Sequence, residues 1–172
     1  MTNKKKILCI IPARSGSKRI KNKNLLKLSN KTLVELAYQS AKESKIFKNI
    51  FVSTDKLKVA KNLPWIKRSK KLSGSKSDIS DVIHECLLKS ELMTNTKFDY
   101  VVCLQPTSPL RNALLIRKLV KNVIKYKANG GITGVRIVPW NWKIVKNHGF
   151  NSWYPKNYPR SQEFKKTIFW QE

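Results

Sequence analysis

The sequence is poor in acidic side chains, histidine and glycine, and each shortage excludes a kind of site. Only 10 of its 172 residues are Asp or Glu, against 36 Lys and Arg. The sequence has two histidines, His84 and His148, and three cysteines, Cys9, Cys86 and Cys103. No two cysteines form a C-x-x-C pair, so we predict no zinc site. The glycines form neither the P-loop pattern G-x-x-x-x-G-K-[ST] nor the dinucleotide-binding pattern G-x-G-x-x-G.

The chain also lacks any apolar run long enough to cross a membrane, and "ILCIIPA" after the basic start is too short for a signal peptide. We therefore predict no membrane span and a cytoplasmic location, where cysteines stay reduced. The length and an apolar fraction of 41% predict a single domain over residues 1–172. A net charge of +26 favours nucleic acid, an anionic membrane or a phosphorylated small molecule, without choosing among them.

Short apolar runs alternate with helical periodicity along most of the chain. The apolar runs predict strands at Ile7–Pro12, Asn49–Thr54, 100–105 and 131–138. Helical spacing between them predicts three helices, marked by Leu33, Leu36, Ala37 and Ala41, by Ile79, Val82, Ile83, Cys86 and Leu87, and by Ile116, Leu119, Val120 and Val123. Ser77 or Asp78 is expected to cap the second helix. The alternation predicts an α/β fold, a mainly parallel sheet with helices on both faces.

Three polar segments follow predicted strands, where open parallel sheets bind ligands: "ARSGSKRIKNKN", "TDKLK" and "QPTSPLR". Two of them, the first and the last, carry the candidate ligand contacts. In residues 13–24 ("ARSGSKRIKNKN"), called here the basic loop, Arg14 offers a planar fork to phosphate oxygens and Lys23 a mobile point charge. Ser15 and Gly16 are small enough for backbone N–H groups to point at phosphate. The alternative for this loop is a solvated basic surface.

The second segment is residues 104–111 ("LQPTSPLR"), called here the proline loop. Its two prolines rigidify the backbone, and it presents Gln105, Thr107, Ser108 and Arg111. Gln105, at a strand end, is placed to hydrogen-bond a polyhydroxylated ligand. A plain turn leading into the next helix is the alternative.

Together, "IIPARSGSKRIKNKN", "VSTD" and "LQPTSPLR", in this order and spacing, resemble the acylneuraminate cytidylyltransferases, also called CMP-sugar-acid synthetases. The resemblance covers nearly the whole chain. It implies a Rossmann-like nucleotide-diphospho-sugar transferase fold and a reaction of CTP with a 2-keto sugar acid of sialic, legionaminic or pseudaminic type. The products are a CMP-sugar and pyrophosphate, and Mg²⁺ is the expected cofactor.

The resemblance also implies roles for individual residues. Arg14 and Lys23 are the expected catalytic cations. The expected nucleotide-binding residues are Ala13, Arg14, Ser15, Gly16, Lys23, Asn24, Arg68 and Ser77. The expected substrate-binding residues are Gln105, Ser108, Arg111, Arg160 and Gln162. Arg160 in "PRSQ" is expected to meet the carboxylate of the sugar acid through its guanidinium fork.

The sequence departs from the family where acidic residues are expected. The family's Leu-Ala-x-Asp is replaced by Leu-Ser-Gly-Ser, which puts Ser75 where a carboxylate is expected. The family's Mg²⁺-binding acidic residues and its dimerisation arm have no counterpart before Glu172, so we predict a fold incomplete at its C-terminus and no identified metal ligand. Asp78 is a candidate substitute for the carboxylate missing at Ser75, and Asp55, at a strand end, is a candidate substitute for the metal ligand. We therefore expect very low or no CMP-sugar synthesis.

Two further hypotheses stay open at this stage. The chain could be an inactive remnant of the same fold. It could instead be a basic nucleic-acid-binding protein, since aromatic residues lie among lysines near its end: Trp140, Trp142, Trp153, Tyr154 and Tyr158. We regard nucleic acid as the less favoured partner because the lysines are spread along the whole chain and no nucleic-acid motif is present.

Overall fold

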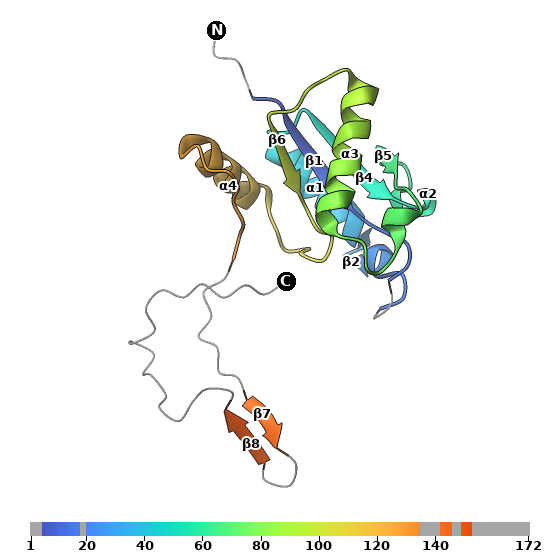
Figure 1. The fold of residues 1–172 in the computed structure, drawn as a ribbon, viewed down its shortest axis with the longest axis vertical. Coiled ribbons are helices and arrows are strands. Elements are labelled where there is room, and N and C mark those ends of the chain that lie inside the picture. The colour runs from blue at the N-terminus through green and yellow to red at the C-terminus, as the bar shows by residue number, and fades with distance from the viewer. Residues whose placement is uncertain (1–4, 18–19, 135–141, 146–148, 153–172) are drawn as a thin grey trace. The chain divides into compact units, whose positions relative to one another are not determined.

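The structure is a computed structural model that describes residues 5–17, 20–134, 142–145 and 149–152. The chain divides into two compact units, Met1–Ala128 and Asn129–Glu172, which are described separately. In the first unit four parallel strands form one sheet in the order β5-β4-β1-β6 (Figure 1). Their bounds are β1 Ile7–Pro12, β4 Asn49–Thr54, β5 Trp65–Lys67 and β6 Tyr100–Cys103.

The connections between the strands determine where along the edge of the sheet a ligand can bind. They are η1 (Lys23–Leu25), β2 (Lys27–Leu28), β3 (Lys31–Thr32) and α1 (Leu33–Ser44) after β1, α2 (Leu57–Ala60) after β4, η2 (Lys71–Ser73) and α3 (Ile79–Thr94) after β5, and α4 (Ala113–Lys125) after β6. The chain runs outward from β1 through β4 to β5, then returns to add β6 on the other side of β1. The order of the strands therefore reverses between β1 and β6, and sheets of this kind bind ligands at such a point.

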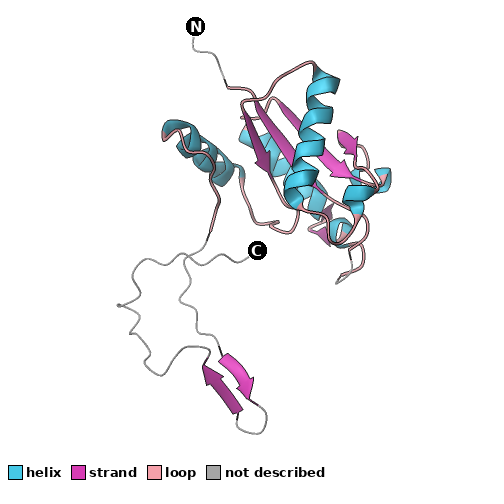
Figure 2. Ribbon diagram, viewed as in Figure 1, coloured by secondary structure: helices cyan, strands magenta, loops and turns pink. Residues whose placement is uncertain are grey.

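Alternate side chains of β1 enter two separate cores, one on each face of the sheet. Cys9 and Ile11 pack with Val34 and Ala37 of α1 and with Ile116 of α4. On the opposite face, Leu8, Ile10, Phe51, Ile66 and Cys86 form the second core, against which Ile83 and Leu87 of α3 pack. Figure 2 shows α3 lying over one face of the strands. The prediction of a parallel sheet with helices on both faces is confirmed.

The helices begin at side-chain caps that the local sequence supplies. Thr32 and Glu35 form a reciprocal capping box at the start of α1, in which Glu35 accepts from the Thr32 backbone N–H at 2.7 Å. Asp78 caps α3 by accepting from the Ser80 N–H at 2.7 Å, as predicted. Asn112 caps α4 in the same way. The proline loop therefore ends at the cap of α4.

Two expectations about strands were wrong in part. Residues 131–134 of the predicted strand 131–138 form no strand, and residues 135–138 lie outside the described residues. The fourth strand of the sheet is β5, which the sequence pattern did not predict because it has three residues and only Ile66 of these is buried. In the second unit β7 (Trp142–Val145) and β8 (Gly149–Ser152) form an antiparallel hairpin, also not predicted.

Within the described part of the chain, no helix is long and apolar enough to span a membrane.

Candidate functional site

The basic loop is held at both of its ends by side chains. Both oxygens of the Asp55 carboxylate, just after β4, accept from Ser15: Oδ1 from the backbone N–H at 2.7 Å and Oδ2 from the hydroxyl at 2.5 Å. At the other end, the buried Asn24 side chain donates its Nδ2 to the Arg14 carbonyl at 2.9 Å. Arg14 and Lys23, both half-buried, therefore lie at the two ends of one closed loop.

Arg68 is buried at the end of β5, an unusual place for a cation without a direct carboxylate partner. Its side chain donates Nη2 to the Ser53 carbonyl at 2.8 Å and Nε to the Ser53 hydroxyl at 3.2 Å. The same Ser53 carbonyl also accepts the Ala13 backbone N–H at 2.9 Å. One residue of β4 therefore fixes both the start of the basic loop and the guanidinium of Arg68.

Two guanidinium groups and one carboxylate influence each other at this edge. Burial lowers the pKa of Arg68, the Asp55 carboxylate opposes this effect, and the Arg14 cation adds to it. Burial would raise the pKa of Asp55, but the hydrogen bonds from Ser15 outweigh it and lower that pKa. The edge therefore carries converging positive charge, and its Asp55 carboxylate is already engaged. Such a place suits an anionic ligand.

The proline loop lies on the other side of β1 and turns its arginine inward. Arg111 donates Nη2 to the Gln105 carbonyl at 2.9 Å, and its Nη1 is buried with no partner among the described residues. Burial lowers the pKa of Arg111, and the Cys103 and Cys9 thiols oppose this effect. Gln105 and Ser108 are exposed. Gln105 and Ser108 are therefore the predicted substrate residues that are open to a ligand, while Arg111 stabilises the loop.

The segment after Arg68 is fixed to α3. The Ser69 backbone N–H donates to both oxygens of Glu85 at 3.2 Å, and the Ser73 hydroxyl donates to the Ser69 carbonyl at 2.7 Å. Ser77, predicted to bind nucleotide, is half-buried and donates its hydroxyl to the Lys71 carbonyl at 3.4 Å. Ser75 is exposed. This segment provides hydroxyl groups rather than carboxylates.

Two predicted site residues lack a described position, and the contacts that Ser53 and Asp55 make were not predicted. Arg160 and Gln162 lie outside the described residues. Ser53 and the Asp55–Ser15 contact emerge only from the fold, although Asp55 stands at the end of a strand in "VSTD". The pattern of a polar residue and an acid closing an apolar strand is the signal that could have found them.

Among the described residues, no ligand is assigned to the Mg²⁺ ion that the resemblance implies. Within residues 5–17, 20–134 and the β7–β8 strands, no group of three or more His, Cys, Asp or Glu side chains comes together. Asp55 is engaged by Ser15, and Asp78 caps α3. The cysteines are no alternative ligands, because Mg²⁺ prefers carboxylate, carbonyl and water oxygens to sulfur.

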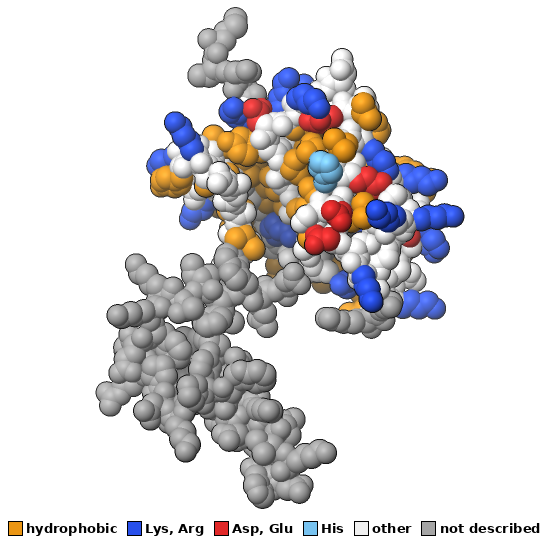
Figure 3. Space-filling model, viewed as in Figure 1, with side chains coloured by type: hydrophobic (Ala, Val, Ile, Leu, Met, Phe, Trp, Pro, Cys, Tyr) orange, Lys and Arg blue, Asp and Glu red, His pale blue; other side chains and the backbone are white. Residues whose placement is uncertain are grey.

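Basic side chains on the face that carries α3 are scattered. Figure 3 shows Lys and Arg side chains distributed around that face, with acidic side chains among them. A continuous basic stripe of the kind that follows a nucleic-acid backbone is absent from this face among the described residues.

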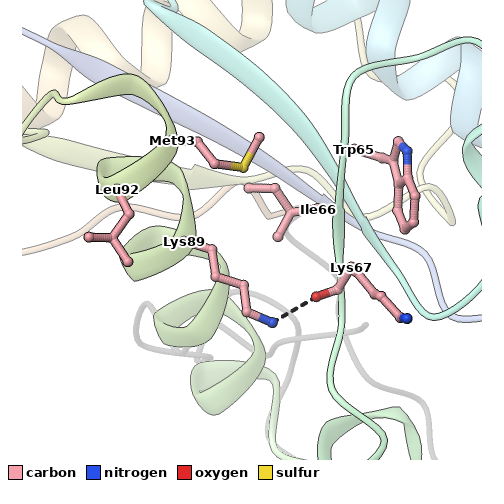
Figure 4. A pocket seen from close by; sticks show the side chains of 6 residues that line it. All are labelled: Trp65, Ile66, Lys67, Lys89, Leu92 and Met93. Atoms are coloured by element: carbon pink, nitrogen blue, oxygen red, sulfur yellow. Dashed lines mark hydrogen bonds between the residues drawn. The ribbon is translucent and has the colours of Figure 1, made fainter.

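An open apolar depression of about 480 Å³ lies between β5 and the C-terminal half of α3. Figure 4 shows its lining residues, with Lys89 donating Nζ to the Lys67 carbonyl at 2.8 Å. The lining residues are Trp65, Ile66, Lys67, Lys89, Leu92 and Met93. None belongs to the basic or proline loop, so this depression is separate from the charged edge.

Comparisons with known proteins identify sequences and folds similar to this chain. The sequence profile described as Cytidylyltransferase matches residues 8–149. The chain is 30% identical over 178 residues to "Post-translational flagellin modification protein B" of Campylobacter coli, covering 95% of this chain and 76% of that protein. It is 37% identical over 123 residues to "CMP-N,N'-diacetyllegionaminic acid synthase" of Legionella pneumophila, covering 67% of this chain and 52% of that protein. It spans about half or less of the length of the other similar curated proteins.

Among solved structures, a CMP:2-keto-3-deoxy-manno-octonic acid synthetase complexed with CTP is similar in fold. It has a TM-score of 0.57 and 22% sequence identity, covering 72% of this chain and 49% of the other. This likeness supports the parallel-sheet architecture and its Rossmann-like character.

Proposed function

Because the chain belongs to the cytidylyltransferase family, we propose that it binds CTP at the carboxyl edge of its sheet and transfers CMP to a 2-keto sugar acid, releasing pyrophosphate. The observation that carries the proposal is that Ser53 of β4 fixes both the start of the basic loop, through the Ala13 backbone N–H, and the guanidinium of Arg68, through Nη2. A closed loop that carries Arg14 and Lys23 suits a triphosphate, and a fixed guanidinium beside it can bind another part of the nucleotide.

The proposed roles follow from where each group lies. Arg14 and Lys23 contact the phosphates and stabilise the charge that develops on the α-phosphate and the leaving pyrophosphate. A cation 4 Å from a phosphate charge contributes about 4 kcal/mol at an effective dielectric of 20. Asn24 acts indirectly, because its side chain donates a hydrogen bond to the Arg14 carbonyl. Ser77 lies in the same region and is proposed as a nucleotide contact.

Arg68 is proposed to hold the cytidine end. Its Nη2 and Nε are occupied by Ser53, so it meets the nucleotide through its remaining N–H donors and its flat face. Backbone N–H groups of the basic loop are partly committed: Ser15 donates to Asp55, and Ser17 donates to the Ser15 carbonyl at 3.2 Å. In this account the phosphates are met mainly by side-chain cations.

The sugar acid is proposed to lie beside the proline loop. Exposed Gln105 and Ser108 hydrogen-bond its hydroxyl groups, and Arg160 meets its carboxylate. A legionaminic, sialic or pseudaminic type of acid is proposed because a relative is named a CMP-N,N'-diacetyllegionaminic acid synthase. The reacting hydroxyl attacks the α-phosphorus, and the protein contributes orientation and charge stabilisation.

The testing experiment mixes excess protein with CTP, Mg²⁺ and one sugar acid at a time, and detects CMP-sugar by mass spectrometry. Excess protein reveals even slow transfer. We expect CMP-sugar from at least one of the sialic, legionaminic or pseudaminic acids, and no product when ATP replaces CTP. CTP binding without product from any acid would favour the inactive-remnant hypothesis.

The nucleic-acid hypothesis gains no support from the described residues. It depends on aromatic side chains between Trp140 and Tyr158, which lie outside those residues or have no described side-chain placement. The face in Figure 3 carries no basic stripe among its described side chains. The cytidylyltransferase proposal is therefore preferred.

A further inference from the structure

Asp55 is a carboxylate at an edge that otherwise gathers positive charge. A negative group beside a triphosphate weakens its binding through charge repulsion. Both of its oxygens nevertheless face the basic loop and accept from Ser15, at 2.7 Å and 2.5 Å. The contact joins residues 40 positions apart in the sequence. Asp55 must therefore contribute to an anion site by holding the basic loop in position and not by its own charge.

Ser15 immediately follows Arg14, so the two hydrogen bonds determine where the Arg14 backbone lies. On its other side, Ala13 is fixed by the Ser53 carbonyl at 2.9 Å. Arg14 is thus held between two anchors, Ser53 and Asp55, which are two residues apart in and just after β4. The Asn24 side chain adds a third contact, to the carbonyl of Arg14 itself.

Anchoring of the Arg14 backbone acts against the charge repulsion at this edge. The Arg14 cation lowers the pKa of Arg68, so the two guanidinium groups repel each other. An anchored backbone restricts how far the Arg14 side chain can move away from Arg68. A guanidinium fork needs a fixed approach to bind two phosphate oxygens at once, whereas an ammonium group does not.

We propose that Asp55 is a positioning residue for the nucleotide: it holds Ser15 by two hydrogen bonds and thereby aligns Arg14 with the phosphates of CTP, without contacting CTP itself. This inference rests on the proposed function, and it adds a residue to which the resemblance assigns no role in binding the nucleotide.

The test measures CTP affinity by calorimetry at fixed ionic strength, well below the melting temperature of each variant. Asp55→Ala removes both hydrogen bonds and is expected to weaken CTP binding about ten-fold or more. Asp55→Asn can accept from the Ser15 N–H and donate to its hydroxyl, so it is expected to stay within about three-fold of wild type. Glu43→Gln on the exposed side of α1 is the matched control, with no expected change.

A double variant separates positioning from a general effect on stability. Arg14→Lys replaces the planar guanidinium by an ammonium group, which binds phosphate without a fixed orientation. The alignment that Asp55 provides should therefore matter little in this variant. Adding Asp55→Ala to Arg14→Lys is expected to cost less than about three-fold, far below its effect in wild type. If Asp55→Ala does not fold, Ser15→Ala in both backgrounds carries the same comparison.

Three results would overturn the inference alone. The first is a wild-type chain that binds CTP no better than Asp55→Ala does. The second is an Asp55→Asn variant as weak as Asp55→Ala. The third is a loss of affinity from Asp55→Ala that is as large in the Arg14→Lys background as in the wild-type background. A wild-type chain that binds no CTP would instead overturn the proposed function, and this inference with it.

Discussion

Glu35 allows a quantitative test of how the segment after the basic loop is attached to α1. Its carboxylate accepts from the Thr32 N–H at 2.7 Å and the Thr32 hydroxyl at 2.8 Å, and it pairs with Lys61 at 3.0 Å. The hydrogen bond from the Thr32 backbone is the main cause that lowers the pKa of Glu35 from 4.5 to about 2, with burial opposing it. The folded state therefore favours the ionised form.

The size of the effect follows from that pKa. At 1.36 kcal/mol for each pKa unit, the full depression would be worth about 3.4 kcal/mol. The side chain is 29% exposed and its partner Lys61 is 47% exposed, so solvent screens much of this. Caps are worth about 0.5–2 kcal/mol in measured proteins. We expect Glu35→Gln to lower the free energy of unfolding by about 1 kcal/mol and Glu35→Ala by about 2 kcal/mol near pH 6.

The pH dependence has a definite sign. Because the folded pKa lies below the unfolded one, the stabilisation is fully present above pH 4.5 and is lost as the pH falls toward 2. Urea unfolding of wild type and Glu35→Gln between pH 6 and pH 3 measures it, with Glu43→Gln on the same helix as the control. The difference should shrink to less than about half by pH 3. A difference that stays constant with pH, or that is absent at pH 6, would refute the reasoning.

The remaining predictions concern the proposed ligand contacts. Arg160→Ala is expected to weaken sugar-acid binding and leave CTP binding unchanged, as measured by calorimetry; the opposite pattern would rule out its role at the carboxylate. Arg68→Met is expected to weaken CTP binding about ten-fold and to change the melting temperature little, since the Ser53 carbonyl keeps its bond from Ala13 and a buried cation is removed. Unchanged affinity would remove Arg68 from the site.

The regular part of the fold could be predicted because its signals are local. β1 and β4 are apolar runs, and α3 has an apolar stripe with Asp78 as its cap. β5 could not be predicted, because its three residues become a strand only by pairing with β4. The predicted strand at residues 131–138 was wrong over residues 131–134, which pair with no strand among the described residues. An apolar pattern without such pairing does not form a strand.

The candidate site shows the same limit at the level of side chains. Residue types in the segments after strands predicted Arg14, Lys23 and Gln105 as ligand contacts. Which cations turn inward depends on where the folded backbone places hydrogen-bond acceptors. Arg68 is 6% exposed because Ser53 offers two oxygens, and the guanidinium of Arg111 meets the carbonyl of Gln105. Sequence spacing alone could not reveal either contact.

The central claim is that the basic loop binds the phosphates of CTP, and calorimetry with point variants tests it most directly. The chain carries a net charge of +26, so Lys42→Ala, at an exposed position in the last turn of α1, serves as the control for nonspecific attraction. At physiological salt we expect Arg14→Ala and Lys23→Ala each to weaken CTP binding about ten-fold or more, and Lys42→Ala to change it less than about two-fold. Equal affinity in wild type, Arg14→Ala and Lys23→Ala would contradict the account.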